Sequence, residues 1–135
     1  MARSRKRHNQ HLALDLGQLP IKKIERTLGL ELDPGEVVFS VGAQIHAAKK
    51  HPEDFASYLP FVGTVVSDPL YLGDDARNPD KIEFISRLPG QPGGLLVAVE
   101  ICRDSNGKYN DCSIYTLKQS QIEARRLKGY LKPCK

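Results

Sequence analysis

The sequence has no long hydrophobic run. Its longest apolar stretches, "LPFVGTVV" and "GGLLVAV", are well short of the roughly 20 residues that a membrane-spanning helix needs. No apolar signal region follows the basic N-terminus either. We therefore expect no membrane partner and a cytoplasmic location, in the producing cell or in a target or host cell.

Cysteine is scarce and carries no recognisable spacing. The three cysteines, Cys102, Cys112 and Cys134, are odd in number and form no CxxC pair, which argues against a disulfide framework and against a structural zinc cluster. A reducing compartment fits this usage best. Cys102 and Cys112 fall on two segments that we expect to pair as strands, so a bridge between them stays open.

Several catalytic motifs are also missing. The chain contains no P-loop, no GxGxxG turn, no GxSxG elbow and no HExxH helix, and it has no cluster of carboxylates that would hold magnesium. We predict neither a cofactor nor a metal site. The chain does carry a modest excess of basic residues, with a net charge of +4, which permits binding to a polyanion without proving it.

Length and composition predict one compact domain. At 135 residues and 40% apolar content the chain can bury one core but not two, and it contains no repeat. Residues 1–11, "MARSRKRHNQH", are basic and lack apolar periodicity. We expect them to be a disordered arm, which either clamps phosphates loosely or is mere flanking sequence. Residues 12–135 form the predicted domain.

The first half of the chain is predicted to be mainly helical. Hydrophobic spacing indicates a short helix in "LPIKKIERTLGL", and "EVVF" is typical of a short strand. Ser40 is a good N-cap for the helix "VGAQIHAAKK", which Pro52 should break at His51. A second helix is predicted over "PEDFASYLPFVGTVVS". The apolar stripe of the first of these two helices consists of Val41, Ile45 and Ala48.

The second half changes to period-two alternation. Strands are predicted in "LYLG", "KIEFISRL", "GLLVAVEICR" and "KYNDCSIYTL", with a hairpin turn at Asn106-Gly107 between the last two. The closing helix lies in "KQSQIEARRLKGYL", with Ile122 and Leu127 facing inward. The predicted fold class is α+β. Its N-terminal helices pack on one face of a four-stranded antiparallel sheet, a C-terminal helix closes the fold, and the other face is free.

Strand alternation predicts which side chains line the free face. One strand places Leu95, Val97, Val99 and Ile101 on the core side and Ala98 and Glu100 on the other. In the last strand Ser113 and Tyr115 project together onto the free face, as an ordinary polar surface or as part of a site. Glu83 and Arg87 lie on the polar side of their strand, where an ordinary cross-strand ion pair would be enough to explain them.

The helix "VGAQIHAAKK" and the residue after it concentrate basic side chains. His46 and Lys50 are four residues apart and share a face, with Lys49 beside them. His51 is five residues from His46, about 140° round an ideal helix, so the two imidazoles do not form the i,i+4 pair that chelates a metal. The break at Pro52 frees His51 from the helical direction and can bring both imidazoles to one cleft. The alternative is a solvated basic helix end.

These residue types suit the cleavage of RNA without a metal. That reaction needs one group to take the proton of the 2′-OH, one to protonate the leaving 5′-oxygen, and cations or donors around the phosphorane-like transition state. Histidine can serve either proton role near neutral pH. Lysine or arginine can stabilise the charge, and Ser or Tyr hydroxyls can bind the phosphate oxygens.

From about Pro20 to Pro133 the sequence resembles the phage-associated branch of the barnase, EndoU, colicin and RelE-like nuclease superfamily, the BECR superfamily. The segments that carry the resemblance are "IHAAKKHPEDFASYLPFVGTVVSDPLYLG", "KIEFISRL", "LLVAVEI" and "CSIYTLKQSQIEARRLKGYLKP". It departs from that pattern after Tyr115, where a proline is expected soon and none follows.

The resemblance implies an α+β fold and a metal-independent endoribonuclease of the toxin or effector type, with RNA, tRNA among the candidates, as substrate and an immunity protein or antitoxin as a further partner. By matching positions, it implies His46 and His51 as acid and base, in an order left open, Lys50 as a transition-state contact, and Ser113 and Tyr115 as the strand contribution. Further RNA or phosphate contacts are predicted at Lys49, Arg87 and Thr116. Two other readings stay open. These are a nonenzymatic nucleic-acid-binding or virion-associated module, and a protein-interaction domain.

Overall fold

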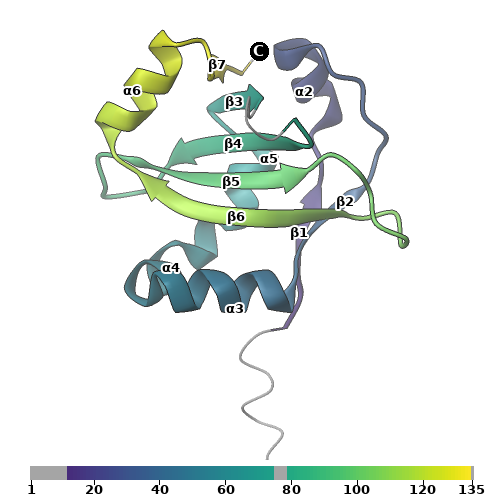
Figure 1. Ribbon diagram of the computed structural model, residues 1–135, viewed down its shortest axis with the longest axis horizontal. Helices are drawn as coiled ribbons and strands as arrows, with labels where there is room; N and C mark the ends of the chain where they lie inside the picture. Colours follow the sequence, from purple (N-terminus) through teal and green to yellow (C-terminus); the bar gives the residue numbers. More distant parts are fainter. Residues whose placement is uncertain (1–11, 75–78, 135) are drawn as a thin grey trace, which may run out of the picture.

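The computed structural model describes residues 12–74 and 79–134, apart from the side chain of Cys112. The predicted arm, residues 1–11, lies outside the described residues. Seven strands form one sheet in the order β1-β2-β6-β5-β4-β3-β7 (Figure 1). Their bounds are β1 (Leu14–Gln18), β2 (Glu36–Phe39), β3 (Tyr71–Asp74), β4 (Lys81–Arg87), β5 (Gly94–Glu100), β6 (Tyr109–Leu117) and β7 (Lys132–Pro133).

The predicted strands β3 to β6 are present and antiparallel, but the prediction of a four-stranded sheet is wrong. β1 and β2 extend the sheet beyond β6, and β7 pairs with β3 at the opposite edge. β2 runs parallel to β6, and the two strands pair only at Val37 with Tyr109 and Val38 with Asn110. The rest of β6 therefore has an edge that β2 does not cover.

The helices begin and end close to where caps and prolines predict. Their bounds are α2 (Ile21–Leu28), α3 (Val41–Lys50), α4 (Pro52–Tyr58), α5 (Val62–Ser67) and α6 (Gln119–Leu127), with a 3-10 turn η1 (Leu59–Phe61). The Ser40 hydroxyl accepts a hydrogen bond from the Ala43 N–H at 3.1 Å. The single helix predicted from Pro52 is instead divided into α4, η1 and α5, with Pro60 in the 3-10 turn, where its missing N–H leaves no helical bond unmade.

The sheet is buried on both faces, so the prediction of a free second face is wrong. The N-terminal helices cover the first face, where Leu95, Val97 and Val99 belong to the main core. The second face has a smaller apolar cluster, made of Ile85, Leu96, Ala98, Leu117, Ile122 and Leu131. The run "LLVAV" is apolar at both alternating sets of positions, which is typical of a strand covered on both sides. Figure 1 shows α5 behind the strands, α3 and α4 below β6, and α6 at the upper left near β7, and Ile122 of α6 belongs to the second cluster.

The predicted apolar faces of α3 and α6 are only partly correct. In α3, Val41 and Ile45 are exposed, while Gln44 and Ala47 are buried. Gln44 is buried because its amide donates hydrogen bonds to the backbone carbonyls of Phe39 (3.0 Å) and Leu12. In α6, Ile122 is buried as predicted.

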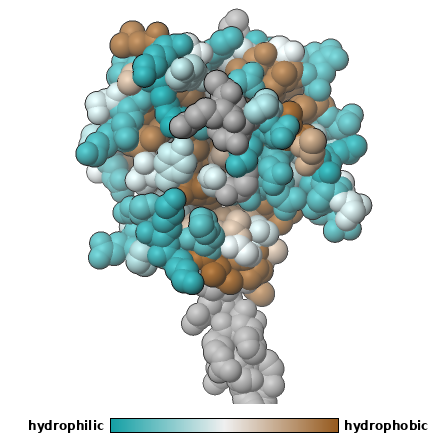
Figure 2. Space-filling model, viewed as in Figure 1, coloured by the Kyte–Doolittle hydropathy of each residue, from teal (hydrophilic) through white to brown (hydrophobic). Residues whose placement is uncertain are grey.

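Leu127, predicted to face inward from α6, is 88% exposed; Leu131, beyond the helix, fills the second cluster. On the face of the molecule seen in Figure 2, hydrophobic patches lie at the outer end of α6 and at the lower edge, where α3 lies. None of the helices in the described parts of the chain has the length and apolar character to cross a membrane. The α+β class itself is confirmed.

Candidate active site

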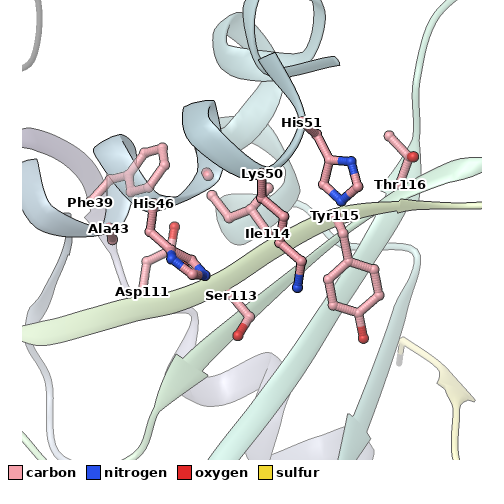
Figure 3. Close-up of a pocket in the computed structure, with 11 residues that line it drawn as sticks. Phe39, Ala43, His46, Lys50, His51, Asp111, Ser113, Ile114, Tyr115 and Thr116 are labelled. Atoms are coloured by element: carbon pink, nitrogen blue, oxygen red, sulfur yellow. The ribbon is translucent and has the colours of Figure 1, made fainter. Parts of the chain in front are cut away.

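A cavity of about 360 Å³ lies between α3 and the uncovered edge of β6 (Figure 3). It exists because β2 leaves β6 after two residue pairs and α3 begins directly after β2, so this helix runs beside the remaining length of β6. Its lining consists of Phe39, Ala43, His46, Ala47, Lys50, His51, Asp111, Ser113, Ile114, Tyr115 and Thr116.

The basic side chains enter the cavity from α3 and from the residue that ends it. His46 and Lys50 lie on the helix face toward β6, and His51 follows at the break, with φ −141° and ψ 71°. Its backbone has left the α-helical region, which turns the ring back toward the cavity. The structure therefore brings both histidines to one cavity, as the break at Pro52 allowed, and all three basic side chains are exposed.

Ser113 and Tyr115 approach the same cavity from the other side of β6. They lie opposite Ala98 and Leu96 of β5, on the second face, whereas Ile114 lies opposite Val97 on the first. In Figure 3 the α3 side chains point toward β6, while Ser113 and Tyr115 leave β6 on the side away from α3. The cavity thus wraps around a strand edge.

A paired network positions Tyr115. The Arg125 guanidinium of α6 donates a hydrogen bond to the Tyr115 hydroxyl at 3.4 Å and forms an ion pair with Glu83 at 2.9 Å. Glu83 is nearly buried and Arg125 partly so. Sequence reasoning missed Arg125. Its position three residues after the inward-facing Ile122 was a usable signal, because residues three apart share a helix face.

The remaining predicted contacts divide between the cavity and the outside. Thr116 lines the cavity. Lys49 is exposed on α3, and Arg87 is exposed at the end of β4; neither belongs to the cavity lining. The structure therefore does not bring these two cations into the cavity with the other predicted residues.

Asp111 is a cavity residue that the sequence did not predict. Its side chain is only 3% exposed, and neither carboxylate oxygen makes a full hydrogen bond to any residue in the described ranges. Burial raises the pKa of Asp111 well above its usual range, and the nearby backbone N–H of Ser113 offsets only part of that effect. The carboxyl is therefore an acid–base group with a shifted titration at the wall of a cavity.

Cys102 and Cys134 lie outside the cavity lining. Cys102 is an exposed free thiol, so the bridge with Cys112 that the sequence left open is not formed. Cys134 is also free, and desolvation raises its pKa. Across residues 12–74 and 79–134, no group of three or more His, Cys, Asp or Glu side chains is arranged to hold a metal ion.

Comparison with known proteins gives one family and one curated relative. A family model described as phage-Barnase-EndoU-ColicinE5/D-RelE like nuclease3 matches residues 15–124. A protein of Afipia carboxidovorans named succinyl-diaminopimelate desuccinylase is 32% identical over 88 residues, which is 62% of this chain. The matched part spans only 22% of that relative's length, so its name describes a much longer protein. No solved structure matches the chain.

Proposed function

Because the chain belongs to the phage-Barnase-EndoU-ColicinE5/D-RelE like nuclease3 family, we propose that it is an endoribonuclease that cleaves RNA without a metal ion. The observation that carries the proposal is the cavity between α3 and β6, whose lining includes two histidines, one lysine and three residues with hydroxyl groups. These are the groups that an internal attack by the ribose 2′-oxygen requires.

In the proposed reaction, one of His46 and His51 takes the proton of the 2′-OH. The 2′-oxygen then bonds to phosphorus, the bond from phosphorus to the 5′-oxygen breaks, and the other imidazole gives a proton to that leaving oxygen. The products are a 2′,3′-cyclic phosphate and a 5′-hydroxyl. The Lys50 ammonium stabilises the charge that develops on the phosphate, and the hydroxyls of Ser113 and Tyr115 donate hydrogen bonds to its oxygens.

Cleavage of total RNA in excess EDTA tests the proposal. Purified protein is expected to cut RNA and leave 2′,3′-cyclic phosphate ends, identified by their resistance to phosphatase until acid opens the ring to a phosphomonoester. His46→Ala and His51→Ala should each lower the rate about 10²–10⁴-fold, the usual contribution of an acid or base.

Glu53→Ala is the matched control, because Glu53 is an exposed residue of α4 outside the cavity lining. This variant should cut like the unmodified protein. Intact RNA in the presence of folded protein would refute the proposal, as would histidine variants that cut at the unmodified rate.

A nonenzymatic nucleic-acid-binding or virion-associated module is the second candidate. The exposed cations outside the cavity, Lys49 and Arg87, favour it, because they can contact phosphates without taking part in chemistry. Binding that falls steeply with salt and is unchanged in both histidine variants would support this function over the first.

The biological partners follow from the toxin or effector role that we propose for the nuclease. Its substrate would be RNA, with tRNA as the first candidate to examine, and an immunity protein or antitoxin would cover the cavity. Expression in a bacterial host should arrest growth, and His51→Ala should relieve the arrest. Growth that is unaffected by the unmodified, folded protein would contradict this role.

A further inference from the structure

Asp111, which lines the cavity, and Tyr58 of α4 are two buried polar residues that interact electrostatically. Asp111 is 3% exposed and Tyr58 is 1% exposed, and within the described residues neither the carboxylate oxygens nor the tyrosine hydroxyl has a full hydrogen-bond partner. Desolvation, with the negative charges of Asp111 and Asp54, raises the pKa of Tyr58 to about 12. A buried polar group without a partner destabilises a fold. Packing therefore gives no reason for a carboxyl here.

A β-bulge turns Asp111 toward α3. Ser113 pairs with Ala98, but the next residue of β5, Val99, pairs with Asp111 rather than with Cys112. One extra residue of β6 is thus inserted, so Asp111 shares the face of Val99 and the main core. Regular alternation would have placed it on the face of Ser113. Bulges recur beside active sites, where they redirect a side chain.

The cavity has two ends, and Asp111 lies at one of them with His46. In Figure 3 the His46 and Asp111 side chains are drawn on one side of the cavity and those of His51, Tyr115 and Thr116 on the other, and all five residues belong to its lining. His46 is exposed and belongs to the same cavity lining as Asp111, so its imidazole can reorient about two side-chain torsions.

Few other titratable or charged groups face Asp111. Lys50 and His51 line the same cavity, farther along β6. Tyr58 of α4 interacts electrostatically with Asp111, and the exposed Asp54 of the same helix acts on Tyr58. Among the described residues that line the cavity, His46 is the ionisable group drawn on the same side as Asp111.

We propose that Asp111 is a positioning residue for His46, sharing one proton with its imidazole and thereby making His46 the general acid of the reaction. This inference rests on the proposed nuclease function. In this scheme the shared proton starts on the Asp111 carboxyl, because burial raises the pKa of that group. A bound phosphate favours positive charge beside it, so the proton moves from the Asp111 oxygen to the His46 ring, leaving a carboxylate and an imidazolium. His46 then gives a proton to the leaving 5′-oxygen, and His51 takes the 2′-OH proton.

Asp111 itself does not touch RNA in this scheme, because its carboxylate oxygens are inaccessible to solvent. Its effect is on the proton of His46. Asp111→Asn keeps the shape of the side chain and removes the transferable proton. We expect this change to lower kcat about 10–100-fold, the usual loss when the partner that orients a functional histidine is removed, and to leave KM nearly unchanged.

An NMR titration of the histidine ring protons tests the coupling without any need for activity. In the unmodified protein the His46 signals, assigned by their loss in His46→Ala, should show an inflection where Asp111 ionises. That inflection should be absent in Asp111→Asn and retained in Asp54→Asn, which removes an exposed carboxyl of α4. The inflection itself is measured in the unmodified protein, and the folded Asp54→Asn variant shows whether it belongs to Asp111.

The outcomes separate this inference from the proposed function. If the protein cuts no RNA but His46 still reports the ionisation of Asp111, the coupling stands and the nuclease proposal fails. If the protein cuts RNA but the His46 signals do not respond to Asp111, the inference is overturned. Cleavage by folded Asp111→Asn at the unmodified rate also overturns it.

Discussion

The described part of the sheet contains two buried carboxyl groups that differ in their hydrogen-bond partners. Glu83 on β4 is 7% exposed and forms an ion pair at 2.9 Å with Arg125, which also contacts Tyr115. Asp111 on β6 is 3% exposed and has no full hydrogen bond to a described residue. Both groups lose the solvation of water, but Glu83 gains a charged partner, whereas Asp111 has only the nearby backbone N–H of Ser113 to offset part of its burial.

The difference separates a structural from a functional use of a buried charge. Glu83 binds Arg125 of α6 and so helps to hold this helix on the second face of the sheet. The ion pair acts there together with the smaller apolar cluster. Asp111 contributes nothing comparable, and it lies at a cavity wall beside a bulge. Strained or unsatisfied groups concentrate at functional sites, where function rather than stability retains them.

The largest expected effect on stability comes from removing Glu83, the buried carboxylate that has a charged partner. Glu83→Ala leaves the Arg125 guanidinium partly buried without its carboxylate, and we expect the free energy of unfolding to fall by about 2–4 kcal/mol, measured by urea denaturation. Glu100→Ala removes an exposed glutamate at the end of β5 and is the control, with an expected change below about 0.5 kcal/mol. Equal losses in the two variants would remove the distinction between Glu83 and a surface carboxylate.

Removing the buried carboxyl of Asp111 should instead raise the free energy of unfolding. The folded-state pKa of Asp111 is raised, so between the unfolded-state value and the folded-state value the unfolded chain has lost a proton that the folded protein keeps. Stability therefore falls as pH rises through that window and levels off above it. Asp111→Asn removes this dependence.

We expect the Asp111→Asn variant to gain about 1–2 kcal/mol relative to the unmodified protein toward the upper end of this window, and little below pH 4. Urea denaturation at a series of pH values measures the difference. A variant that is less stable at every pH would show that Asp111 has a stabilising partner after all.

The sequence predicted the parts of the fold that local chemistry determines. Ser40 and Pro52 define α3 and its break, and strand alternation correctly placed Ser113 and Tyr115 together on one face. The same local reasoning brought His46 and His51 to a shared cleft, because a proline restricts the residue before it wherever it occurs.

What the sequence did not predict depends on contacts between distant segments. β1 forms by pairing with β2, and its Gly17 has a φ of 95°, so its own pattern gave a weak signal. α6 docks through Ile122 and Arg125, not through Leu127. The bulge that redirects Asp111 is a property of the β5–β6 register, and nothing in "YNDCSIY" marks which residue is extra.

The smallest expected effect on stability comes from changing Arg125, which contacts both Glu83 and Tyr115. Arg125 uses two different guanidinium nitrogens, one for Glu83 and one for Tyr115. A lysine ammonium is a single compact charge and cannot make both contacts with this geometry. Arg125→Lys should therefore keep the pairing with Glu83 but lose the hydrogen bond to Tyr115, lowering the free energy of unfolding by about 0.5–1 kcal/mol.

A double-mutant cycle with Tyr115→Phe measures the Arg125 contribution directly. If the hydrogen bond to the Tyr115 hydroxyl is what the lysine loses, Arg125→Lys should have almost no further effect on stability in the Tyr115→Phe background. Additive losses would mean that Arg125 acts on Glu83 alone. In that case Tyr115 would reach the cavity without support from α6, and the paired network would end at the ion pair.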